Sequence, residues 1–530
     1  MPRGDHHAGV EARALDRKRG GYDVPLASSR QKELGLSQAQ ADTKPDVAAN
    51  QTLKLVVSIL SGPLAFLLVQ SVPLAGLDPR GQFGLSCYAW VLAWWVTTPI
   101  PWAVTGFLPL VLFPLTGAMS FADTIGLYGQ RVFPFLMGVM LFGHAFSKHG
   151  LARRMAMSVL SIRGVATSGA RLILMIMVVS AVVSAMVDDA ATVAIMIPIA
   201  VSVARFAGDA SARTGSAGAP RLLEGACLAV LYGATVGGMA TPAGVPFNPL
   251  TISILEQLTG YTVTFVQWTM TGVLLTIATL PVYYFPLIFM APPDVAAIDD
   301  GASYFASQKK KLGPLSLGEK NVLVVLVVMV TLWFLPAFVT IRFLDIWYVP
   351  PVAMLLLFLL PADLRRGEMT LGAKDFQDGV LWNVLFLVVS GTALAAGLAR
   401  LGITDWLGAL IKDSGGVPAS VLPWFAGIVT PLMSHLTSGT ATTSMISTVV
   451  YPIAQDVGYN GAILARIIAG TALAVAFPWG GAASGSAFAS GQISFGSMFK
   501  IGAVVTVLNA LVVIILSMIL VPALGAFTAP

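Results

Sequence analysis

The chain has 530 residues, of which 56% are hydrophobic and only 11% are charged, and its formal net charge is +5. Soluble proteins carry about 25% charged residues, so this composition excludes a soluble globular protein and indicates a polytopic membrane protein. The sequence has no basic stripe with interleaved aromatic residues, which argues against a nucleic-acid partner, and its two cysteines provide neither a disulfide framework nor a metal site.

Residues 1–50 differ from the rest of the chain because they are polar, mixed in charge and poor in large apolar side chains. This composition predicts a disordered tail and is too polar for a secretory signal. Arginine and lysine residues precede the first apolar segment, which favours a cytoplasmic N-terminus. We expect the remainder to lie in the cytoplasmic (inner) membrane.

Apolar segments then follow one another near 54–77, 86–117, 131–147, 171–206, 222–250, 262–291, 321–341, 346–361, 381–398, 418–455, 462–490 and 498–527. Runs of about 20 apolar residues are typical of transmembrane helices and not of a β-barrel. Clusters of Gly, Pro, Ser and Thr interrupt several of them. The sequence therefore predicts an all-α polytopic membrane protein with about eleven transmembrane helices and two re-entrant hairpins.

The chain contains an internal repeat. A polar stretch at 292–320, cytoplasmic because it holds Lys309, Lys310 and Lys311, separates a first repeat (54–291) from a second (321–530). "SAMVDDAAT" from Ser184 aligns with "SHLTSGTAT" from Ser434, and each runs on into Pro-Ile-Ala. A Gly/Pro-rich break follows in each half, at 237–250 and at 477–491. Paired, interrupted apolar segments indicate the midplane site of a transporter.

The first break contains two adjacent carboxylates, Asp188 and Asp189. Ionisable residues at membrane depth are costly and are functional candidates. A half-helix that starts at a break points free N–H groups at a cavity and favours an anion, whereas freed carbonyls can bind a small cation such as sodium. The alternative is that an aspartate only caps the helix that follows, as Thr437 or Ser438 would in the second half.

Several of these segments resemble the divalent anion:sodium symporter (DASS) family, which carries di- and tricarboxylates or sulfate. The resemblance lies in 97–117, 135–156, 381–402, the Pro-Ile-Ala ends and "GVPFN" at 244–248, and extends from about residue 54 to the end. It implies an inverted-repeat homodimer of the elevator type, in which a mobile transport domain moves against a fixed scaffold.

The resemblance also implies the site residues. The family has a Ser-Asn-Thr triplet at each hairpin tip, and here those positions read Asp188-Asp189-Ala190 and Ser438-Gly439-Thr440. The implied substrate-binding residues are Asp189, Ala190, Val245, Asn248, Gly439, Thr440, Gly481 and Ser484. The implied ligands of the coupling ion are Ser184, Asp188, Asp189, Gly244, Ser434, Thr437, Ser438, Gly439 and Gly480.

Both family asparagines are replaced, and the first tip gains two carboxylates. These can hold a cation, share a proton, or face a substrate that carries a positive group. We expect a cation-coupled secondary active transporter of small organic anions such as di- or tricarboxylates, with sodium or a proton as coupling ion and no other cofactor. The expected partners are the small-molecule anion, membrane lipid and a second copy of the chain. The alternative is a proton-coupled or exchange-mode transporter of another anion, either sulfate or an acid that bears an amino group.

One other class of protein fits the sequence less well. Asp188 and Asp189 are consecutive and point in different directions, unlike the converging pair of an aspartyl protease, and neither Gly-x-Ser-x-Gly nor His-Glu-x-x-His occurs. The sequence therefore argues against an intramembrane hydrolase. We expect His435 to be a packed, hydrogen-bonded histidine, and Trp94, Trp95 and Trp102 to be interfacial anchors.

Overall fold

The computed structural model describes residues 45–162, 164, 167–213, 220–298, 301–339, 341, 344–413 and 417–524. The chain divides into two units, Met1–Ile59 and Leu60–Pro530, and the site described below belongs to the second. Residues 1–44 of the predicted tail lie outside the described residues. Helix α2 (Pro45–Ser71) begins within the predicted tail, at a proline whose fixed φ suits the first turn of a helix.

The helices of the first half follow one another with short connections. They are α3 (Pro79–Thr97), α4 (Trp102–Thr105), α5 (Leu108–Thr116), α6 (Phe121–Gly126), α7 (Val132–Lys148), α8 (Leu151–Leu160), α9 (Gly169–Ser184), α10 (Asp189–Arg213), α11 (Pro220–Gly238), α12 (Phe247–Thr259) and α13 (Phe265–Met290). The predicted polar linker contains a further helix, α14 (Gly301–Lys311).

The secondary structure of the described residues in the second half is also helical apart from one hairpin. Its helices are α15 (Leu317–Phe334), the 3-10 turn η1 (Leu335–Ala337), α16 (Val349–Leu359), α17 (Ala373–Asp378), α18 (Trp382–Arg400), α19 (Ile403–Asp413), α20 (Val421–Leu436), α21 (Gly439–Asp456), α22 (Gly461–Thr471), α23 (Ala482–Ala489) and α24 (Phe495–Ala523). The strands β1 (Pro361–Asp363) and β2 (Glu368–Met369) pair antiparallel, with Pro361 opposite Met369.

Within the described residues, six helices are long and apolar enough to cross a membrane: Thr52–Ser71, Asp189–Asp209, Phe265–Met290, Leu317–Ala337, Trp382–Arg400 and Phe495–Ala523. Shorter apolar helices of 10–17 residues accompany them, and several are halves of broken segments, such as α9 before α10 and α20 before α21. The protein is therefore an all-α polytopic membrane protein, as the composition predicts. The number of about eleven spans and the repeat boundaries stay predictions.

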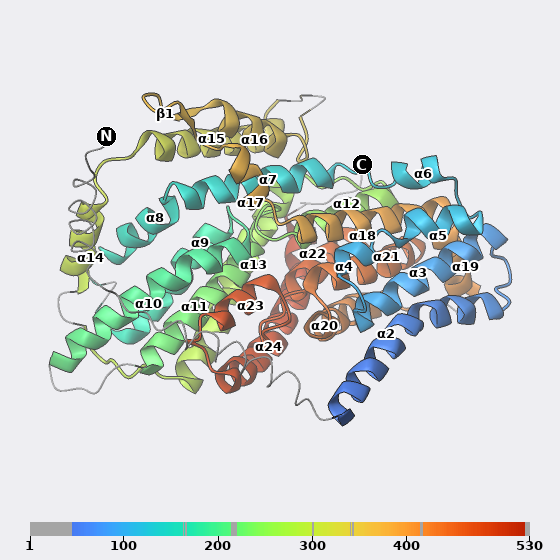
Figure 1. Cartoon of the computed structure of the whole chain (residues 1–530), viewed down its shortest axis with the longest axis horizontal. Helices are drawn as coiled ribbons and strands as arrows, with labels where there is room; N and C mark the ends of the chain where they lie inside the picture. The colour runs from blue at the N-terminus through green and yellow to red at the C-terminus, as the bar shows by residue number, and fades with distance from the viewer. Residues whose placement is uncertain are drawn as a thin grey trace, which may run out of the picture. The chain divides into compact units, whose positions relative to one another are not determined.

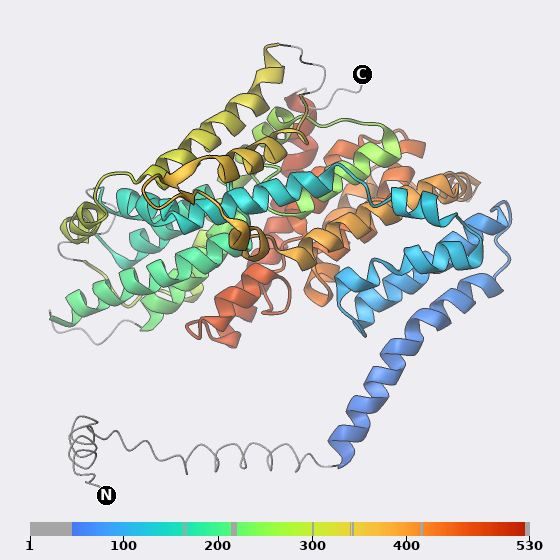
Figure 2. The ribbon, with the colours of Figure 1, turned by 45° about the horizontal axis from the view of Figure 1, so that its top comes forward.

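Small residues allow the helices to approach closely. Helix α11 packs on α9 because Gly233 and Gly237 have no Cβ, which would collide with the backbone of α9. Such contacts replace the hydrophobic driving force that is absent in lipid. Helix α16 lies along α7 in the same way, with Gly138 against the carbonyl of Pro350 (Figures 1 and 2).

Candidate functional site

The first break lies between α9, which ends at Ser184, and α10, which begins at Asp189. The carboxylate of Asp188 caps α10, since its Oδ1 accepts hydrogen bonds from the N–H groups of Ala190 (3.1 Å) and Ala191 (3.4 Å). The capping role considered as the alternative is therefore present. Asp188 nevertheless also faces a cavity, so capping does not account for its whole environment.

The second break repeats this geometry with an uncharged cap. Oγ of Ser438 accepts a hydrogen bond from the N–H of Ala441 (3.2 Å) at the start of α21. The preceding Thr437 donates to the carbonyl of Met433 (3.0 Å) and lies 2.9 Å from Oγ1 of Thr442. Each half of the chain therefore begins a helix at a break with a side-chain cap.

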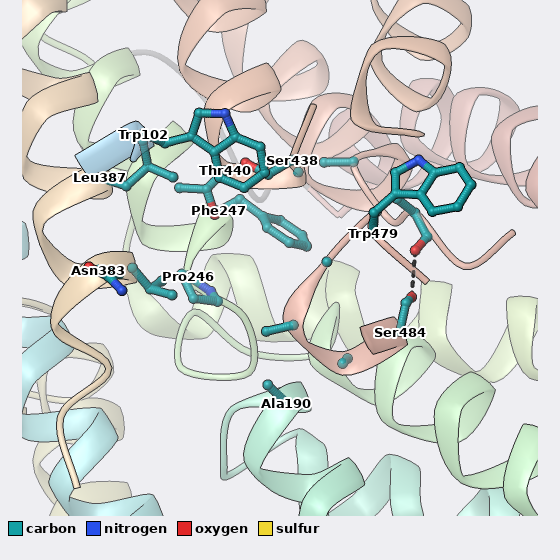
Figure 3. Close-up of a pocket in the computed structure, with 18 of the residues that line it drawn as sticks. Trp102, Ala190, Pro246, Phe247, Asn383, Leu387, Ser438, Thr440, Trp479 and Ser484 are labelled. Atoms are coloured by element: carbon teal, nitrogen blue, oxygen red, sulfur yellow. Dashed lines mark hydrogen bonds between the residues drawn. The ribbon is translucent and has the colours of Figure 1, made fainter. Parts of the chain in front are cut away.

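Both breaks line the same cavity, which has a volume of about 700 Å³. Figure 3 shows Ser438 and Thr440 on one side, Ala190 on the opposite side, and Asn383 and Ser484 on the two flanks. The predicted residues that line this cavity are Asp188, Asp189, Ala190, Ser438, Gly439, Thr440, Gly480, Gly481 and Ser484. Residues about 250 positions apart in the sequence thus come together.

The remaining predicted residues lie behind the cavity wall. They are Ser184, Gly244, Val245, Asn248, Ser434 and Thr437, and all are buried. The hydroxyl of Ser184 donates to the carbonyl of Ala234 (2.6 Å). The hydroxyl of its counterpart Ser434 has no hydrogen-bond partner among the described residues, so an oxygen ligand is available there.

The two downstream loops are built alike. Nδ2 of Asn248 donates to the carbonyl of Gly238 (2.8 Å), and the hydroxyl of Ser484 donates to the carbonyl of Ala474 (2.6 Å), in each case ten residues earlier in the chain. Gly244 and Gly480 occupy equivalent places in the two loops. A Cβ at Gly244 would collide with the carbonyl of Gly238, and one at Gly480 would come within 2.6 Å of the Cβ of Ala474. The internal repeat therefore extends to the contacts inside the loops.

Several lining residues were not predicted. Asn383 at the start of α18, Phe247, Trp479 and Thr235 line the cavity, together with the segment 98–103. The backbone of Thr98 has a φ of 50°, and the prolines that follow it keep this segment out of a continuous helix. The Pro-Ile-Pro pattern at residues 99–101 was the sequence feature that could have predicted this part of the cavity wall.

The tryptophans near this segment correct another expectation. Trp95 is completely buried, so it is not an anchor at the membrane surface, and Trp102 lines the cavity. The indole of Trp102 donates to the carbonyl of Trp95 (3.0 Å), and the indole of Trp95 donates to the carbonyl of Trp102 (3.1 Å). This reciprocal pair holds the segment against the cavity.

His435 is packed and hydrogen-bonded, as predicted. Its Nδ1 lies 2.6 Å from the carbonyl of Pro431, and its Nε2 accepts from the N–H of Ala476 (3.3 Å). These partners require a neutral ring with the proton on Nδ1. The histidine therefore supports the backbone of the second loop.

A second cavity of about 310 Å³ shares Asp188, Ala190, Leu381 and Ala482 with the first. His144, Ser147 and Asp378 also line it, so Asp188 lies in a wall between two cavities. These residues give the second cavity acidic and polar groups beside Asp188.

Next to this cavity, Asp375 joins α17 to α7. It accepts from Lys148 (2.7 Å) and lies 3.0 Å from Nε2 of His144. Burial of Asp375 opposes ionisation, but the hydrogen bonds from Lys148, the N–H of Gly372 and His144 outweigh it and lower the pKa of Asp375 to about 2. The contact is therefore a charged one at neutral pH.

Taken together, the larger cavity has the size of a small-molecule site and offers two kinds of ligand group. The N-termini of α10 and α21 and the polar side chains of Asn383, Ser438 and Thr440 suit an anion, while Asp188 and Asp189 suit a cation. Such a site can hold an anion and a cation together.

Comparison with known proteins identifies the family. The family model "Sodium:sulfate symporter transmembrane region" matches residues 51–527. The sodium-dependent dicarboxylate transporter SdcS of Staphylococcus aureus (strain USA300) is 28% identical over 478 residues, which cover 87% of this chain and 90% of the relative. SdcS of Staphylococcus saprophyticus is 28% identical over 480 residues, with coverage of 88% and 91%.

A solved structure, that of the Alcanivorax borkumensis YdaH transporter, aligns with 76% of this chain and 88% of its own at 14% identity, with a TM-score of 0.47. The assignment of the family rests instead on the family model, which spans nearly the whole membrane region. The chain therefore belongs to the sodium:sulfate symporter family, as the resemblance of its breaks and loops predicted.

Proposed function

We propose that the protein is a secondary active transporter that carries a small organic dicarboxylate across the cytoplasmic membrane together with sodium. The observation that carries this proposal is the meeting of two broken helices, α9–α10 and α20–α21, at one cavity. The names of the SdcS relatives, which match over most of both chains, support sodium and a dicarboxylate as the two solutes.

The anion would bind between the two helix N-termini. Helices α10 and α21 direct the positive ends of their dipoles there, and the side chains of Ser438, Thr440 and Asn383 add donors without adding charge. Ser484, Ala190, Gly439 and Gly481 complete this wall, whereas Val245 and Asn248 would act from behind it by holding the loop.

Sodium would bind near the acidic tip and the two loops. Asp188 and Asp189 supply carboxylate oxygens. Ser184, Ser434, Thr437, Ser438 and the carbonyls of Gly244, Gly439 and Gly480 supply the neutral oxygens that such a hard cation prefers. The second cavity reaches Asp188 from another direction and gives the cation a route that the anion need not share. A proton on the aspartate pair is the second candidate for the coupling ion, because two adjacent carboxylates, of which Asp188 is buried, do not both ionise easily.

The family resemblance and the charge distribution support an orientation in the membrane, an assembly and a mode of action. We place the N-terminus and the Lys309–Lys311 segment on the cytoplasmic side, by the positive-inside rule. Two copies would form a homodimer, in which the breaks and loops move as a transport domain relative to a fixed scaffold. The anion moves unchanged, so the protein would act as a carrier and not as an enzyme.

Transport in proteoliposomes tests the proposal. Uptake of labelled succinate should saturate with substrate, require an inward sodium gradient and show counterflow. A matched potassium gradient is the control, and an imposed pH gradient without sodium tests proton coupling. Saturable uptake that does not depend on sodium but is driven by the pH gradient would identify the proton, and not sodium, as the coupling ion. Absence of counterflow would contradict a carrier.

A thermal-shift screen tests substrate and ion without transport. Carboxylates, sulfate and amino acids are each added with and without sodium at two pH values, since a ligand that binds the folded state raises the unfolding temperature. Stabilisation by sulfate or by an amino acid, and not by dicarboxylates, would favour the alternative substrates.

A further inference from the structure

Arg466 on α22 is a buried cation without an acidic partner. It is 1% exposed, and none of the ion pairs formed within the described part of the chain includes it. An arginine at membrane depth is costly to bury and pairs with carbonyls or other groups in the protein interior. Its position therefore requires a specific explanation.

The guanidinium instead reaches across to the first half of the chain. Its Nη2 donates to the carbonyl of Met239 (2.7 Å), the residue that follows the end of α11, and its Cζ lies 4.4 Å from the ring centre of Trp268. A Cβ at Gly272 would collide with Nη2 and with the carbonyl of Ala240, so this glycine leaves room for the contact. Arg466 thus neutralises the negative C-terminal end of α11.

The first loop receives an arginine, whereas the equivalent second loop does not. At Gly502 on α24, a Cβ would approach the backbone of Val475 and Ala476, just as one at Gly272 would approach that of Met239 and Ala240. The position in α11 that corresponds to Arg466, by the offset that relates Asn248 to Ser484, is Val230. The second loop therefore has no counterpart of the arginine.

The loop that receives the arginine belongs to the half with the two extra carboxylates. Asp188 and Asp189 stand where the second tip has Ser438 and Gly439. The loop also contacts the first break directly, because the hydroxyl of Thr241 donates to the carbonyl of Ala185 (2.6 Å). The excess negative charge and the loop that receives Arg466 thus lie on connected segments.

We propose that Arg466 is a positioning residue that sets the charge balance of the transport cavity. It fixes the first loop through Met239 and offsets part of the negative field of Asp188 and Asp189, so that the cavity accepts a dianion. The expectation that the substrate is a dianion rests on the proposed function. The charge balance between Arg466 and the two aspartates does not.

The test combines charge removal with charge restoration. R466Q keeps a hydrogen-bond donor but removes the charge, R466K keeps the charge, and R365Q on the exposed turn between β1 and β2 is the matched control. We expect R466Q to raise the KM for a dicarboxylate about tenfold and the KM for a monocarboxylate less, with R466K intermediate. The double variant R466Q/D189N should recover part of the loss, because it restores the net charge.

Unfolding temperature of the purified protein gives a readout that is independent of transport. R466Q should lower it, and D189N in the same background should raise it again, whereas R365Q should leave it unchanged. If the R466Q and D189N effects simply add, in KM and in unfolding temperature, Arg466 has only a packing role and the inference fails. If wild-type protein does not transport dicarboxylates but the two unfolding effects are coupled, the proposed function fails and the charge balance stands.

Discussion

Replacing Asp189 with asparagine removes one negative charge from the wall of the larger cavity while keeping the size of the side chain. Asp188 is different, because its Oδ1 also caps α10 through Ala190 and Ala191. D188N keeps an oxygen acceptor for the cap and removes only the charge, whereas D188A removes both. These three variants therefore separate the role of the charge from the role of the cap.

General energies of charged contacts and helix caps give a magnitude for each role. An interaction with a charged group contributes about 1.5–3 kcal/mol, so D189N should raise the sodium concentration for half-maximal uptake at least about tenfold. D188N should have a similar effect with little change in unfolding temperature. D188A should in addition lower the free energy of unfolding by about 1 kcal/mol, because a helix cap is lost.

The assay is the initial rate of dicarboxylate uptake into proteoliposomes, measured over a range of sodium concentrations and at several pH values. Orientation and protein content of the liposomes are matched between variants. Unchanged sodium and pH profiles for both D188N and D189N would refute a role of these carboxylates in ion coupling. If D188A lowers the unfolding temperature but changes neither the sodium profile nor the pH profile, Asp188 acts only as a helix cap.

Four further substitutions test the loops, the second tip and the charged contact outside the cavity. G439A should abolish uptake in proteoliposomes, because the new Cβ would lie 2.5 Å from a backbone carbonyl of the second loop; full uptake would contradict this packing. N248A should lower the unfolding temperature more than S484A, because Asn248 donates to two carbonyls (2.8 and 2.7 Å) and Ser484 to one (2.6 Å), and each hydrogen bond contributes about 1 kcal/mol. Equal shifts in unfolding temperature would contradict this prediction. D375N should lower the unfolding temperature at neutral pH by removing the contact with Lys148. The folded pKa of Asp375 is about 2, below its unfolded value of about 3.9, so the stabilisation is complete above about pH 4 and is lost as the pH falls towards 2. The difference between wild type and D375N should shrink over that interval, and a constant difference would refute the assignment.

The sequence alone determined the class of the protein and the location of its breaks. Hydropathy and interrupted apolar runs are local properties, and they predicted the all-α membrane fold and the breaks before α10 and α21. The family resemblance also implied Asn248 and Ser484 as site residues, and the structure shows the same carbonyl contact in both. Local patterns sufficed for the breaks because each cap bonds residues only two or three positions away.

The tertiary structure decided which side chains face the cavity. Val245 and Asn248 lie behind the wall and Asn383 and Trp102 lie in it, although nothing in their local patterns separates the two groups. The contact of Arg466 with Met239 joins residues 227 positions apart. Such placements depend on how distant helices pack against one another. That packing is set by the shapes and charges of residues far apart in the chain, and hydropathy and local spacing do not show which of these residues meet.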